Sequence, residues 1–76
     1  MSRSVQYEVA IWRVDGAEQE GDHQYFHAGR GGAGMKRAQE LFDSLAVEDD
    51  VESIELRRIQ FVDDEPDTEL VIQEKP

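Results

Sequence analysis

The chain has 76 residues, of which 18 are acidic and 8 are basic, giving a formal net charge of −10. It contains no cysteine, which excludes disulfides, thiol catalysis and zinc sites ligated by cysteine. The length suits one small acidic domain, residues 1–76, and no apolar run is typical of a signal peptide or a membrane span. We therefore expect a cytoplasmic protein folded around a small core.

Alternating apolar and polar residues predict two strands near the start of the chain. The first covers residues 5–14, and its apolar side chains fall on one face: Val5, Tyr7, Val9 and Ile11. The polar stretch 15–22 predicts a hairpin loop, and residues 23–28 predict a shorter second strand. Trp12 and Tyr25 have the parity of the opposite face, so we expect both on the side of the sheet that faces away from a helix.

Apolar residues at spacings of three and four predict an amphipathic helix over residues 35–47. A third strand is predicted over residues 51–62, and its apolar residues change phase along the chain: Ile54 and Leu56, then Ile59 and Phe61. If one face stays buried throughout, this change requires one inserted residue. The pattern therefore predicts a β-bulge at Arg57-Arg58.

The end of the chain predicts a second hairpin. Residues 63–67 are acidic and include Pro66, which is typical of a turn, and Leu70 and Ile72 mark a last strand. The resulting order is strand, strand, helix, strand, strand. It predicts an α+β fold, in which one helix covers one face of a four-stranded antiparallel sheet (β-β-α-β-β).

Catalysis has no candidate residues in this sequence. No serine or threonine lies in a strained nucleophile turn, and a sheet covered by one helix seldom encloses a pocket that raises the pKa of a general acid. His23 and His27 lie four residues apart on a strand, about 13 Å from each other, and so do not converge on one metal ion. We expect no catalytic residue, no metal site and no cofactor.

The segment from Gly29 to Gly34 reads G-x-G-x-x-G before the predicted helix. The dinucleotide-binding fold that uses this motif needs a larger parallel sheet than 76 residues supply. Two interpretations stay open. The segment is a flexible joint, or it is an anion site at the helix start, in a small nucleic-acid or phosphate-ligand binding module that uses Arg30, Lys36 and Arg37.

Acidic residues dominate the second half of the chain, where thirteen acids in residues 39–76 face three bases. Like charges repel a phosphate backbone, so we expect no direct nucleic-acid binding by these residues, and a basic protein surface as the partner. The candidate partner-binding residues are Glu40, Asp43, Glu48, Asp49, Asp50, Asp63, Asp64, Glu65 and Asp67, together with Trp12 and Tyr25.

The leading hypothesis is a non-enzymatic interaction protein that occupies the nucleic-acid-binding surface of a processing enzyme, as a nucleic-acid mimic. The small size, acidity and absence of cysteine give a profile similar to that of anti-CRISPR and anti-restriction inhibitors of phage or other mobile elements. The profile alone carries this similarity, and no motif assigns a family. The simpler alternative is that the acids form a solvated surface. Either a monomer or a homodimer is compatible with the sequence.

Overall fold

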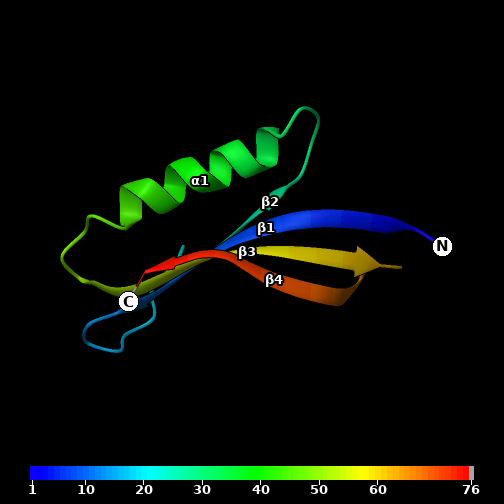
Figure 1. Cartoon of the computed structure of the whole chain (residues 1–76). Helices are drawn as coiled ribbons and strands as arrows, with labels where there is room; N and C mark the ends of the chain where they lie inside the picture. Colours follow the sequence, from blue (N-terminus) through cyan, green and yellow to red (C-terminus); the bar gives the residue numbers. More distant parts are fainter. Residues whose placement is uncertain (76) are drawn as a thin grey trace.

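The computed structural model describes residues 1–75 and has the element order that the sequence predicts (Figure 1). Four antiparallel strands form one sheet in the order β2-β1-β3-β4, and one helix lies on one face of it. The α+β prediction is confirmed. The elements are β1 (Arg3–Arg13), β2 (His23–His27), α1 (Ala33–Leu45), β3 (Val51–Val62) and β4 (Glu65–Lys75).

The core lies between α1 and the two central strands. The alternation of β1 sends Val9 and Ile11 towards the helix, and they pair with Leu56 and Ile54 of β3. Phe42 of α1 packs onto these four side chains and is fully buried. The face predicted from the parity of the first strand is therefore correct.

The helix begins at Ala33, two residues earlier than the periodicity predicts, and one glycine fixes where it sits. Gly34 is buried, and a β-carbon at this position would lie 2.0 Å from the backbone oxygen of His27. Only glycine therefore allows the first turn of α1 to approach the end of β2 so closely. The residue before the helix, Gly32, has φ of 77°, a left-handed conformation that glycine adopts readily.

The predicted bulge at Arg57-Arg58 of β3 is wrong. In its pairing with β1, β3 runs without a register shift from Val62 to Ser53. The ladder between β3 and β4 does shift beside Arg57, but the unpaired residue there is Ile72 of β4. The irregularity thus falls on an edge strand, where an extra residue breaks one ladder instead of two.

Since β3 is continuous, its phase change has a different consequence. Ile54 and Leu56 face the helix, whereas Ile59 and Phe61 lie on the other face, which we call the open face. Ile59 is only 4% exposed although no helix covers it. The open face therefore carries apolar residues of its own.

The hairpin between β3 and β4 is tighter than the predicted turn over residues 63–67. It turns on two residues, Asp63 and Asp64, which both have positive φ (52° and 66°), as a type I′ hairpin turn requires. β4 then begins at Glu65, so Pro66 lies within a strand. Proline is tolerated there because β4 is an edge strand and its register shifts beside this residue.

Replacing Phe42 by alanine should lower the free energy of unfolding by about 3–5 kcal/mol, because the whole ring is removed from the core. Leu41, beside it on α1, is only partly buried. Leu41→Ala should cost roughly half as much. Urea denaturation of both variants checks the assignment, and equal losses would mean that Phe42 is not the centre of the core.

Candidate functional site

Acidic side chains gather at the two ends of a molecule whose longest dimension is 42 Å. At one end, which we call the loop end, the β1–β2 loop and the α1–β3 loop lie together (Figure 1). The backbone N–H of Val14 joins them, donating a 2.9 Å hydrogen bond to the backbone oxygen of Asp50. At the opposite end, the turn end, β3 turns into β4.

The charges divide unevenly among these parts. The loop end holds nine acids and two bases, Arg13 and Lys75; the acids are Asp15, Glu18, Glu20, Asp22, Glu48, Asp49, Asp50 and Glu52, with Glu74 at the end of β4. The turn end holds five acids and one base, Arg3; these acids are Asp63, Asp64, Glu65, Asp67 and Glu69. The remaining four acids and five bases nearly balance in the middle of the molecule. The structure thus brings the four acids of the first loop together with those of the second loop, although the two groups are far apart in the sequence.

Arg13 fastens the loop end. Its Nη2 and Nε donate hydrogen bonds of 2.8–3.2 Å to the carboxylate of Asp22, and its Nη1 pairs with Asp50. Asp22 also accepts a 2.7 Å hydrogen bond from the backbone N–H of Gln19. One cation therefore connects the β1–β2 loop to the α1–β3 loop.

The pKa of Asp22 lies below its ordinary value, first because the Arg13 guanidinium donates hydrogen bonds to it, and next because the backbone N–H of Gln19 does. Asp22 is buried, which sets it apart from the other acids of this end. Sequence analysis missed it as a structural residue, because nothing in the local pattern identifies the partner of Arg13.

The predicted partner-binding acids of the loop end do not all stay available. Asp50 is held by Arg13, whereas Glu48 and Asp49 are exposed and make no ion pair within residues 1–75. On the outer side of α1, Glu40 and Asp43 are exposed, and Asp43 accepts a 3.0 Å hydrogen bond from Gln39.

At the turn end, Asp63 accepts a 2.8 Å hydrogen bond from the backbone N–H of Ser2. This bond ties the start of the chain to the hairpin, together with a second one from the backbone N–H of Asp63 to the backbone oxygen of Ser2. The other predicted acids here are exposed: Asp64, Glu65 and Asp67.

The open face carries both aromatic residues that the sequence assigns to it. Trp12 and Tyr25 are 39% and 55% exposed. The ring of His23 packs edge-on to Trp12, with ring centroids 6.2 Å apart. The Arg57 guanidinium lies 5.7 Å from the centroid of the Trp12 ring, which adds a cation–π contact.

A buried carboxylate lies among these rings. Glu8 is 4% exposed; it receives hydrogen bonds from Arg57 at 3.3 Å and pairs with His23 at 3.1 Å. Hydrogen bonding to Glu8, and then burial, raise the pKa of the Tyr25 phenol. Tyr25 therefore stays neutral over a wider pH range than an isolated tyrosine. Sequence analysis did not single out Glu8, because its position on a strand face resembles that of any exposed acid.

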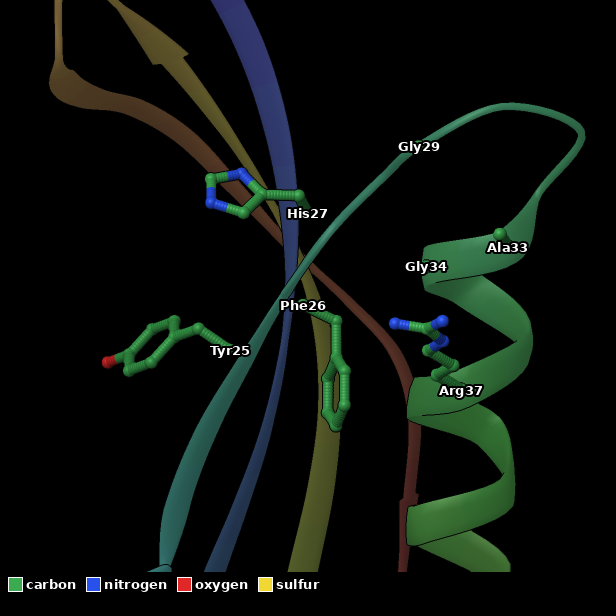
Figure 2. A pocket seen from close by; sticks show the side chains of 7 residues that line it. All are labelled: Tyr25, Phe26, His27, Gly29, Ala33, Gly34 and Arg37. Atoms are coloured by element: carbon green, nitrogen blue, oxygen red, sulfur yellow. The ribbon is translucent and has the colours of Figure 1, made fainter.

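The alternative anion site at the helix start finds its backbone donors already occupied. The N–H of Gly34 donates to the backbone oxygen of Ala28 at 2.8 Å, and the N–H of Ala33 donates to that of Arg30 at 3.2 Å. A cleft of about 440 Å³ opens beside this turn, where Phe26 and Arg37 point towards each other from β2 and α1 (Figure 2). Tyr25 and His27 project to the other side of β2 (Figure 2).

The three basic residues predicted for the anion site lie at the start of α1. Arg30, Lys36 and Arg37 are all exposed, and Arg37 alone lines the cleft. The arrangement supplies cationic side chains but few free N–H groups, so it lacks most of what makes a helix start bind phosphate.

Among residues 1–75, no group of three or more histidine and carboxylate side chains is placed to hold a metal ion. The helix within these residues is too short and too polar to cross a membrane. Comparison with protein-family models, curated proteins and solved structures finds no significant match for this chain. The interpretation of the site therefore depends on its own geometry.

Asp22→Asn should lower the melting temperature at neutral pH, because the neutral amide loses the ion pair with Arg13. Since the folded state lowers the pKa of Asp22, its stabilising effect is present above about pH 4 and is lost as the pH falls through the folded-state pKa. The difference in melting temperature between the variant and the parent should therefore shrink in strong acid. Glu20→Gln, in the same loop, is the control. An equal effect of the two variants would contradict a stabilising role of the Arg13–Asp22 ion pair.

Added neutral salt should raise the melting temperature of the parent. Between about 0.01 and 0.15 M, the screening length falls from roughly 30 to 8 Å, which weakens repulsion among the exposed carboxylates more than the short ion pairs of Arg13. The double variant Glu48→Gln with Asp49→Asn should show a smaller rise. A parent melting temperature that falls with salt would contradict this balance.

Proposed function

We propose that the protein is a non-catalytic interaction protein whose acidic ends bind a basic surface of a partner protein. In its most specific form, it is a nucleic-acid mimic that blocks a nucleic-acid-processing enzyme in the cytoplasm, as anti-CRISPR and anti-restriction inhibitors of mobile elements do. The observation that carries the proposal is the loop end. There Arg13 fastens two loops into one surface, and the exposed carboxylates on it other than Asp50 have no cationic partner in residues 1–75.

Rigidity is what distinguishes such a surface from a solvated acidic tail. A disordered chain must lose backbone and side-chain entropy when it binds, whereas carboxylates on fixed loops lose only the entropy of their side chains. Glu48 and Asp49 immediately precede Asp50, which Arg13 holds. Asp15 lies two residues after β1 and accepts a hydrogen bond from the N–H of Ala17. The acids most useful for binding thus adjoin fixed points.

The distance between the two acidic ends favours a long binding channel. The molecule is 42 Å long, which equals roughly twelve base pairs of a duplex at 3.4 Å each. One compact basic pocket cannot contact both ends, whereas a nucleic-acid channel can. Because the middle of the molecule is nearly neutral, we expect two separate contacts instead of one continuous strip of charge.

The test begins with affinity capture of partners from the source cell on the immobilised chain. A captured nucleic-acid-binding protein should be released by its own DNA or RNA, and its affinity for the chain should fall steeply with salt. A partner that binds nucleic acid and the chain at the same time would contradict the mimic. A gel shift of nucleic acid by the chain itself would instead favour the alternative phosphate-binding module at the helix start.

Charge reversal then locates the contacts. Glu48→Lys with Asp49→Lys at the loop end, and Asp64→Lys with Asp67→Lys at the turn end, should each weaken binding about tenfold, and the two effects should multiply. Glu40→Lys reverses an exposed charge halfway along α1, away from both acidic ends, and is the control. Asp50 and Asp63 are left unchanged because both make structural bonds. If neither pair changes affinity, the acids are a solvated surface.

A further inference from the structure

The open face is hollowed between its two edge strands. The hollow has a volume of about 410 Å³ and is lined by Gln6, Tyr25, Ile59, Phe61, Pro66 and Glu69. The central strands β1 and β3 supply Gln6, Ile59 and Phe61, while Tyr25 comes from β2 and the last two from β4. It exists because the phase change of β3 places Ile59 and Phe61 on this face.

The lining combines three different chemistries. Ile59, Phe61 and Pro66 are apolar. Tyr25 contributes an aromatic ring that is more than half exposed. Glu69 contributes a carboxylate that is exposed and forms no ion pair within residues 1–75. A ligand that matches this lining has an apolar stem, a planar group and a positive charge.

We propose that the hollow receives an arginine side chain of the basic partner protein. The three methylene groups of arginine pack on Ile59 and Phe61, and its guanidinium stacks on the ring of Tyr25. The same guanidinium donates two parallel hydrogen bonds to the carboxylate of Glu69. The inference rests on the proposed function, since it takes the partner to be a basic protein.

The nearest cation on the open face does not oppose an incoming positive charge. Arg57 pairs with Glu55 at 3.0 Å and with Glu8 at 3.3 Å, so its charge is already neutralised. Glu69 has no such partner in the described chain. A free carboxylate of this face therefore lies at the hollow.

Other occupants fit less well. An apolar ligand would take the Glu69 carboxylate out of water without a compensating partner, which costs free energy. A lysine supplies a charge but no planar group to stack on Tyr25 and no forked donor. A second copy of the chain would bring another net charge of −10 to the same face, and the two copies would repel each other.

The experiment is a titration of the full chain with three short blocked peptides, in which binding is measured by the changes in amide chemical shifts in NMR spectra. The peptides are acetyl-Gly-Arg-Gly-amide, its lysine analogue and its citrulline analogue, which keeps the planar group but loses the charge. At about 0.15 M salt, weak contacts with the exposed acids at the two ends are largely screened. The arginine peptide should give saturable shifts at Tyr25, Ile59 and Glu69, with weaker binding for lysine and none for citrulline.

Two variants that should weaken binding, each with a matched control, sharpen the test. Glu69→Gln should weaken the binding of the arginine peptide at least about tenfold, since it removes the charge-assisted hydrogen bonds. Glu74→Gln removes an equal charge from the same strand outside the hollow and should have no effect. Tyr25→Leu should weaken binding several-fold, whereas Tyr25→Phe, which keeps the ring, should not.

Shifts confined to the loop end, equal binding of the citrulline peptide, or indifference to Glu69→Gln would each overturn the proposal. A dimer in sedimentation experiments that Tyr25→Leu dissociates would also overturn it, because the hollow would then be covered by a second copy. None of these results concerns the charge reversals at the loop end. Failure of the hollow is thus distinguishable from failure of the proposed function.

Discussion

The loop end depends on one side chain, Arg13. The two loops of this end carry seven carboxylates that mutual repulsion would separate, and Arg13 is the base beside them. The buried acid Asp22 accepts hydrogen bonds from the Nε and Nη2 of Arg13, and Asp50 accepts one from its Nη1. A surface pair of this kind is worth little when it is isolated and exposed. Here it also positions the backbone, because Asp22 accepts a hydrogen bond from the N–H of Ile11 through its own carbonyl. The Arg13–Asp22 ion pair is therefore coupled to the backbone of β1.

The second constraint is that one short helix cannot cover four strands. α1 packs on β1, β2 and β3, and reaches β4 through a 2.9 Å hydrogen bond from Gln39 to Gln73. Towards the turn end, the strands continue past the helix (Figure 1). An apolar residue of β3 in this part gains nothing from the helix side. Ile59 and Phe61 instead join the open face, which explains why the phase of β3 changes where it does.

The sequence predicts those features that depend on local periodicity. Alternation located the strands, spacings of three and four located the helix, and parity placed Trp12 and Tyr25 on the open face correctly. The bulge was misplaced because a phase change has two explanations, an inserted residue or a second buried face, and the sequence of one strand does not separate them. The role of Asp22 was missed for another reason. Its partner Arg13 is nine residues away across a loop, and only the folded loop brings them together.

The acidic ends and the hollow act over different distances, and this division has a kinetic meaning. Charges at the ends attract a basic surface over about one screening length, roughly 8 Å at physiological salt, and so raise the rate of association. These exposed charges contribute little to the stability of the complex, because water and salt screen them. A side chain buried in the hollow acts only on contact, but there it excludes water and slows dissociation. A binder that had only the ends would associate quickly and leave quickly. The hollow lies against the turn end through Glu69, so the same carboxylate can serve first in attraction and then in the closed contact.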